Sequence, residues 1–330
     1  MGREPHPSLA PAAGPRVPGK PVGSLPGTCL RSALVIYQDP LAYLLGLEGI
    51  ALLDAWAGDH DRAFTDARLA EIRRLLDDER LQGRGVVAER VSAVTAYEQQ
   101  SVGYDARAGG GLFAADEPVV AGYLDSRAPG VALDAACGTG RFAELLARRG
   151  HRVIGVDSSP DMLAQALRRV PDGEFHVAEL DRLPLPDDSA DVIVCALALV
   201  HVPRLQPVMT EFARVLRPGG DLVISDVHHQ RVTLGSVIKA RGPAGEPWIA
   251  ATYRHQLGDY LRAALSLGLQ VKRCEEPTAT GTGAPLPVPA GEIGDWRYWP
   301  WSLMGYLPSA AQAAGRCPSL VIWHFQLSAT

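Results

Sequence analysis

Residues 131–163 constrain the fold of this chain more than any other stretch. They begin with a short apolar run at 131–133, which is typical of a strand covered on both faces of a parallel sheet. Gly138 and Gly140 follow and allow a turn that is too tight for bulkier residues. Apolar residues at helical spacing come next, and a second apolar run then ends at Asp157. The pattern predicts a βαβ unit.

The predicted unit also indicates a ligand. Two glycines at a helix N-terminus expose backbone amides to a ligand, and an acid at the end of the second strand is placed to hold both hydroxyls of a ribose. An adenosine-containing cofactor is therefore expected. Taken as G-x-G-x-x-A through Ala143, the motif is the dinucleotide fingerprint of an oxidoreductase. Taken as D-x-A-C-G-T-G from Asp134, it resembles the first motif of class I S-adenosylmethionine (SAM)-dependent methyltransferases.

Four later segments favour the methyltransferase alternative. The sequence EFARVLRPGGDLVISD at 211–226 resembles the helix, turn and strand of that family, and the D-x-S-x-D lead-in at 187–191 is a second resemblance. Strand-like runs at 267–273 and 319–325 add two strands, the last of them antiparallel, whereas the sixth strand of a dinucleotide-binding sheet is parallel. An NAD-dependent oxidoreductase is left as a remote alternative.

The resemblance covers about residues 96–230 and implies an α/β fold, with a Rossmann-like, seven-stranded, mostly parallel sheet whose last strand is antiparallel. Residues 116–330 are assigned to this methyltransferase domain, with a substrate-covering insertion at about 228–260. Residues 29–115 are predicted to be a helical N-terminal extension, because their apolar residues recur at helical spacing. Residues 1–28 are rich in Pro and Gly and are predicted to be disordered.

The same resemblance implies where the cofactor, SAM, binds. Glu179 is expected to accept a hydrogen bond from the adenine amino group, although the family more often has Asp there, and the backbone N–H of Leu180 is expected to donate to the ring. The segment 96–108 resembles the "YD" segment that covers the cofactor, with Tyr97, Tyr104 and Asp105 as its notable residues. The full set of expected cofactor residues is Asp134, Ala136, Cys137, Gly138, Gly140, Asp157, Ser158, Met162, Glu179, Leu180, Ala196 and Tyr104.

Candidate catalytic residues follow from the requirements of methyl transfer, which needs in-line positioning and a base when the acceptor is a hydroxyl or an amine. Ligands in open α/β sheets bind beyond the carboxyl ends of the strands. His201 follows the fourth predicted strand, Asp226 ends the fifth, His228 lies just beyond it, and His255 lies in the next connection. His201 with Asp226 resembles the layout of methyltransferases of small aromatic or glycosylated metabolites, and this resemblance implies that Asp226 orients or charge-stabilises His201. The alternative for each is a structural role, since neutral histidines and loop-ordering acids are common.

Several features bear on partners and location. The net charge of −5 gives no reason to expect nucleic acid or an anionic membrane surface as a partner, and no apolar run approaches the ~18 residues of a membrane span. Five scattered cysteines without a metal-type pair favour a reducing cytoplasm and no bound metal. The N-terminal helices are a possible homodimer surface. Aromatic residues at 296–301, with Tyr306, either pack on the sheet edge or wall the acceptor pocket.

The expected function is methyl transfer from SAM to a small-molecule acceptor in specialised metabolism, with oxygen as the preferred acceptor atom. No [DNS]-P-P-[YFW] tetrad follows the fourth strand, where residues 195–198 read CALA, and this disfavours methylation of adenine or amide nitrogens. Other N-methylation, C-methylation, or a non-methylating reaction of a SAM-binding enzyme such as a cyclase are the alternatives.

Overall fold

A computed structural model describes residues 35–98, 112–125, 127–278, 288–289 and 291–329, all of which belong to one compact unit. The segment 1–28 that was predicted to be disordered lies outside these ranges.

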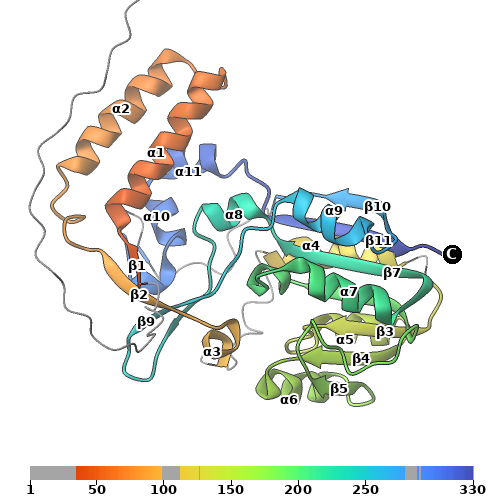
Figure 1. The fold of residues 1–330 in the computed structure, drawn as a ribbon. Coiled ribbons are helices and arrows are strands. Elements are labelled where there is room, and N and C mark those ends of the chain that lie inside the picture. The colour runs from red at the N-terminus through yellow and green to blue at the C-terminus, as the bar shows by residue number, and fades with distance from the viewer. Residues whose placement is uncertain (1–34, 99–111, 126, 279–287, 290, 330) are drawn as a thin grey trace, which may run out of the picture. The chain divides into compact units, whose positions relative to one another are not determined.

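Seven strands form the larger sheet. They are β3 (Val131–Ala135), β4 (Arg152–Asp157), β5 (Glu174–Val177), β6 (Ala190–Ala196), β7 (Leu216–Val227), β10 (Leu269–Glu275) and β11 (Leu320–Leu327). Their order across the sheet is β10-β11-β7-β6-β3-β4-β5 (Figure 1). Neighbours from β7 to β5 are parallel, and β11 is antiparallel to both β7 and β10. The predicted Rossmann-like fold with an antiparallel last strand is confirmed.

Helices cover both faces of this sheet: α4 (Leu112–Leu124), α5 (Arg141–Arg148), α6 (Pro160–Arg169), α7 (Leu205–Val215) and α9 (Leu257–Leu265). Phe212 of α7 and Tyr260 of α9 are buried in one core, while Phe142 of α5 is buried in another with residues of α4. Burial on both faces explains why the central strands are apolar throughout.

A second, four-stranded sheet was not predicted. Its strands are β1 (Val35–Gln38), β2 (Val86–Val91), β8 (Lys239–Arg241) and β9 (Pro247–Ala250), in the order β1-β2-β9-β8. The N-terminal extension is therefore not purely helical, which corrects the prediction for its described part. β2 pairs in parallel with β9 from the predicted insertion, so the extension and the insertion share one sheet. Strands this short carry little local signal, and their partners are far away in the sequence.

The remaining described α-helices are α1 (Pro40–Ala57), α2 (Arg62–Leu76), α3 (Ala93–Glu98), α8 (His229–Thr233), α10 (Trp301–Tyr306) and α11 (Pro308–Ala314), and two 3-10 helices lie at Leu199–His201 and Trp296–Tyr298. Leu44 and Leu47 of α1 are buried in one core with Trp296, Trp299 and Leu303. Trp296 and Trp299 thus belong to this second core, with Tyr306 packed against it, and a role of the aromatic residues in the acceptor pocket stays a prediction.

Helix α1 is long and apolar enough, by length and composition alone, to cross a membrane. Its Leu44, Leu47 and Ala51 are buried in the second core, and 28% of the helix is buried inside the structure. Its Trp56 is 92% exposed. The homodimer through the N-terminal helices stays a prediction.

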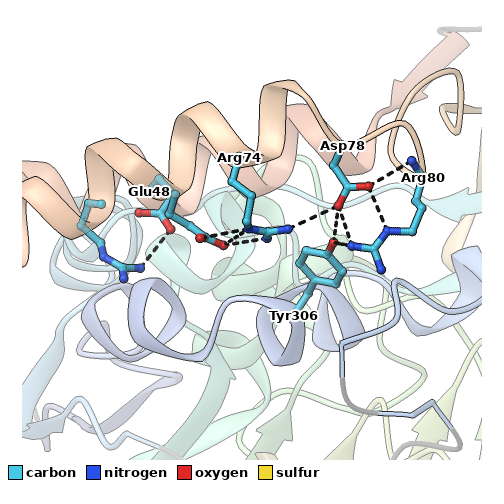
Figure 2. A network of polar contacts seen from close by, with 7 residues as sticks. Glu48, Arg74, Asp78, Arg80 and Tyr306 are labelled. Atoms are coloured by element: carbon cyan, nitrogen blue, oxygen red, sulfur yellow. Dashed lines mark hydrogen bonds and ion pairs between the residues drawn. The ribbon is translucent and has the colours of Figure 1, made fainter.

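A polar network joins α2 to the C-terminal helices, as Figure 2 shows. The Tyr306 hydroxyl donates to Asp78 Oδ2 at 2.8 Å, and Arg80 donates to Tyr306 Oη at 2.9 Å and to Asp78 Oδ2 at 2.7 Å. Arg74 Nη2 pairs with Glu71 at 2.7 Å, and Arg74 Nη1 lies 3.4 Å from Asp78. Hydrogen bonds to charged partners are the stronger kind, so this network fixes the end of α2 against α10.

Candidate active site

A pocket of about 550 Å³ opens at the carboxyl ends of β3, β4 and β6. Its walls come from the segments that follow β3, β4, β5 and β6, from the start of α7, and from α3. This is the edge of an open α/β sheet where ligands bind. Helix α3 brings the N-terminal part of the chain to the same pocket.

Most of the predicted cofactor residues line this pocket: Ala136, Gly138, Asp157, Ser158, Met162, Glu179, Leu180 and Ala196. Asp134, Cys137 and Gly140 do not line it. Tyr104, and Asp105 beside it, lie outside the described residues.

The two glycines of the turn have different roles. Gly138 has a φ of 52°, and a Cβ added there would meet no atom within 4 Å, because the residue faces the open pocket. Gly140 has a φ of 86°, and its Cβ would lie 3.0 Å from Cα of Ala166 on α6. Gly140 thus allows two helices to pack closely, and its contact with the cofactor stays a prediction. The glycine spacing alone does not tell these two roles apart.

Asp157 is held at the pocket by backbone amides. Its Oδ2 accepts from the Gly138 N–H at 2.8 Å and its Oδ1 accepts from the Ser159 N–H at 2.9 Å. Burial raises the pKa of Asp157, and these backbone bonds oppose the rise. Each carboxylate oxygen keeps a further lone pair, so the side chain fits the two hydroxyls of a ribose.

Asp134 and Cys137 lie beneath the pocket surface. Asp134 is 2% exposed, its Oδ2 has no hydrogen-bond partner among the described residues, and burial raises the pKa of its carboxyl to about 7. A buried acceptor without a partner is costly, and it fits a donor group of a bound cofactor. Cys137 packs with Leu163, Ala166 and Phe175 in a small core, and its contact with the cofactor stays a prediction.

Two residues at strand ends have strained backbones. Ala136 after β3 has a φ of 60° and Leu197 after β6 has a φ of 57°, and both line the pocket. Residues other than glycine rarely adopt a positive φ, and such backbone strain is concentrated at functional sites. Leu197 was missed by sequence reasoning, because nothing about a leucine in an apolar run indicates a positive φ.

His201 is the predicted catalytic residue that lines the pocket. Its Nδ1 lies 2.8 Å from the Ala251 carbonyl oxygen, and a carbonyl only accepts, so Nδ1 carries the hydrogen. In the neutral ring Nε2 is then an acceptor, and it lies 3.3 Å from Tyr97 Oη. Burial lowers the pKa of His201, opposed by the bond to Ala251, so the imidazole is neutral at neutral pH.

Asp226 does not line the pocket. It is completely buried, and it accepts from the Tyr260 hydroxyl at 2.7 Å and from the Val227 N–H at 2.9 Å. Burial raises the pKa of this carboxyl to about 6. The expectation that Asp226 orients His201 is therefore wrong, because the carbonyl of Ala251 does so.

The other two candidate histidines do not line the pocket. His228 Nε2 lies 2.8 Å from Glu276 Oε1, and its Nδ1 accepts from the Gln230 N–H at the start of α8. His255 Nε2 lies 3.1 Å from the Leu199 carbonyl oxygen and 2.8 Å from that of Val202, so it donates to the backbone. Both histidines make hydrogen bonds outside the lining of the pocket, as expected for the structural role that was the alternative to catalysis.

The part of the wall that the sequence did not indicate comes from Ser92, Ala93 and Val94 at the start of α3, and from Arg204 and Pro207 around the start of α7. No local motif marks these positions, because they reach the pocket through the unpredicted second sheet and through the loop after β6.

Comparisons with known proteins agree with this geometry. Residues 133–224 match a family described as a methyltransferase domain. Malonyl-[acyl-carrier protein] O-methyltransferase of Yersinia pestis is 37% identical over 95 residues, which are 29% of this chain and 36% of that protein. Methyltransferase GfsG of Streptomyces halstedii is 41% identical over 111 residues, which are 32% of this chain and 40% of that protein. The chain thus spans less than half of the length of these relatives.

Among solved structures, the complex between the Haloferax volcanii Trm112 methyltransferase activator and a methyltransferase contains a similar chain. The TM-score is 0.55 at 18% identity, and the match covers 72% of this chain and 98% of that one. At this identity the likeness concerns the fold. The family match favours the methyltransferase over the dinucleotide interpretation of the glycine motif.

Proposed function

We propose that residues 133–224, which match a methyltransferase domain, form a class I SAM-dependent methyltransferase domain and that the chain transfers the methyl group of SAM to an oxygen atom of a small-molecule acceptor. One observation carries this proposal: a neutral His201 lines the pocket with Nδ1 committed to Ala251, which leaves Nε2 as the basic nitrogen.

The cofactor contacts belong to residues at the strand ends. Asp157 would accept from the ribose hydroxyls, the backbone at Gly138 would allow close approach, and Leu180 would donate from its N–H to the adenine ring. Asp134 would receive a donor group on its unpaired Oδ2. When bound, SAM supplies an electrophilic methyl group, so the protein contributes mainly positioning.

His201 contributes the base. Its bond to Ala251 fixes both the tautomer and the direction of the ring, and its low pKa keeps Nε2 unprotonated at neutral pH. An acceptor hydroxyl loses its proton towards Nε2 as the carbon–oxygen bond forms. A positioned histidine of this kind contributes roughly 10²–10⁴-fold to the rate.

An O-methyltransferase among the relatives supports oxygen as the acceptor atom, and a product of specialised metabolism is our choice of acceptor class. N-methylation, C-methylation and a non-methylating reaction are the outcomes that would replace this choice. The test is incubation with methyl-labelled SAM and the small-molecule fraction of a cell extract, followed by mass spectrometry. A labelled ether or ester supports the proposal, and a labelled amine or carbon centre, or no label, refutes it.

The base is tested with His201→Ala against His176→Ala, since His176 lies outside the pocket wall. We expect His201→Ala to keep SAM affinity within a few-fold but to lower turnover by about 10² or more, and His176→Ala to change neither. The wild-type rate should fall below the depressed pKa of His201, where the ring becomes protonated, and stay level above it. If His201→Ala lowers turnover less than tenfold at every pH, then His201 is not the base.

A further inference from the structure

Tyr97 belongs to the same pocket wall as His201 and contacts it directly. Its hydroxyl oxygen lies 3.3 Å from His201 Nε2, and the two rings meet edge to face, with centroids 5.7 Å apart at 85°. Tyr97 is on α3, far from His201 in the sequence, and both side chains line the pocket.

The tautomer of His201 determines the direction of this contact. Because Nδ1 donates to Ala251, the neutral ring has its only lone pair on Nε2, and Tyr97 must be the donor. The lone pair that would receive the proton of the acceptor is therefore already engaged by a phenol hydroxyl. A proton from the acceptor reaches Nε2 either through Tyr97 or after Tyr97 has moved aside.

We propose that Tyr97 is a catalytic residue that relays the proton of the acceptor to His201, a role that rests on the proposed O-methylation. The acceptor O–H bond breaks and its proton bonds to Tyr97 Oη, while the original Tyr97 proton moves to His201 Nε2. The acceptor oxygen gains the methyl group as the bond from that carbon to sulfur breaks, and the electron pair of that bond stays on sulfur. The positive charge of the sulfonium is thus replaced by that of the imidazolium, which later loses its proton to water.

The anchoring of α3 favours relay over displacement. Ala96, next to Tyr97, is completely buried in a small core with residues of β8 and β9. The Ala251 N–H donates to the Val91 carbonyl oxygen at 2.8 Å, and Ser92 Oγ accepts from the Thr95 N–H at 3.0 Å at the start of the helix. These contacts hold the backbone that carries Tyr97 beside the carbonyl that orients His201.

The test is Tyr97→Phe, which removes one oxygen and keeps the ring. Tyr253→Phe is the matched control, because Tyr253 stacks on His255 and does not line the pocket. We expect Tyr97→Phe to keep SAM affinity within a few-fold and to lower turnover about as much as His201→Ala, by 10² or more. The double variant should be no slower than His201→Ala alone, since residues of one relay are not additive.

A second measurement does not depend on turnover. The His201 pKa, followed by NMR of the imidazole, should rise in Tyr97→Phe, because a donor to the neutral ring has been lost, and it should not change in Tyr253→Phe. An unchanged His201 pKa would show that no such hydrogen bond exists and would overturn the relay.

The kinetic outcomes separate this inference from the proposed function. If His201→Ala is impaired but Tyr97→Phe turns over as fast as wild type or faster, Tyr97 merely covers the lone pair and the relay is wrong. A change in KM alone would assign Tyr97 to packing and would also overturn it. A wild-type protein that binds SAM but methylates no acceptor oxygen refutes the proposed function, and the relay with it.

Discussion

Gly138 offers the sharpest test of where the cofactor lies, through comparison of Gly138→Ala with Gly83→Ala. Both glycines have a positive φ, 52° and 65°, and at neither would an added Cβ meet an atom within 4 Å. Only Gly138 lines the pocket. The two substitutions therefore impose the same kind of backbone strain, and only one places a methyl group where the cofactor is expected.

The expected magnitudes follow from this geometry. A left-handed backbone costs an alanine about 1–2 kcal/mol, so both variants should unfold a few degrees below wild type. The added methyl of Gly138→Ala should also lower SAM affinity at least tenfold, about 1.4 kcal/mol, while Gly83→Ala keeps it. Gly140→Ala should lose about 1–3 kcal/mol more stability than either, because its Cβ would lie 3.0 Å from the Cα of Ala166, closer than ordinary van der Waals contact.

The assay is isothermal titration with SAM at a temperature where thermal melts show all three variants to be folded. If Gly138→Ala binds SAM as tightly as Gly83→Ala does, the cofactor does not lie against this turn. If Gly138→Ala and Gly83→Ala lose SAM affinity equally, the loss reflects general destabilisation, and again the cofactor does not lie against the turn at Gly138.

Two carboxylates give further predictions. Asp157→Ala should weaken SAM binding by about 1.5–3 kcal/mol, the cost of unpaired hydroxyls, and unchanged affinity by titration in a folded variant would contradict the ribose assignment. For Asp134, the folded pKa of about 7 lies above the ordinary value near 4, so the folded state binds the proton more tightly and stability falls as pH rises through this window. In Asp134→Asn the free energy of unfolding should fall less steeply with pH than in wild type, by up to about 1.4 kcal/mol per pH unit. If urea unfolding gives the same pH dependence of this free energy for both proteins from about pH 4.5 to 7.5, the pKa of Asp134 is not raised.

Local patterns account for the part of the fold that could be predicted. The strand ending before Ala136, the turn at Gly138 and the acid at Asp157 form one continuous unit, so neighbouring residues carry the signal. The second sheet could not be found in this way. Its central pair joins Glu89 to Trp248, and no short-range pattern records a pairing over that separation.

In the site, too, one part could be predicted from the sequence and another could not. His201 was identified from its position after a strand, which topology makes informative. Its orienting partner is the backbone carbonyl of Ala251, and a carbonyl has no sequence signature because every residue has one. The acid expected in that role, Asp226, lies on the right strand but is bonded to Tyr260 instead.

The second core has a consequence for synthesis on the ribosome. It joins Leu44 and Leu47, near the start of the chain, to Trp299 and Leu303, near its end. At about 5–20 residues per second, the later residues emerge roughly 10 to 50 seconds after the earlier ones. In that interval the strands from β3 to β7 are available and α1 can pack on α2, while the side of α1 that packs on α10 and α11 has yet to meet its partners. The nascent chain therefore carries a partly covered hydrophobic helix throughout this interval, which is when chaperone binding to residues 40–57 would matter most.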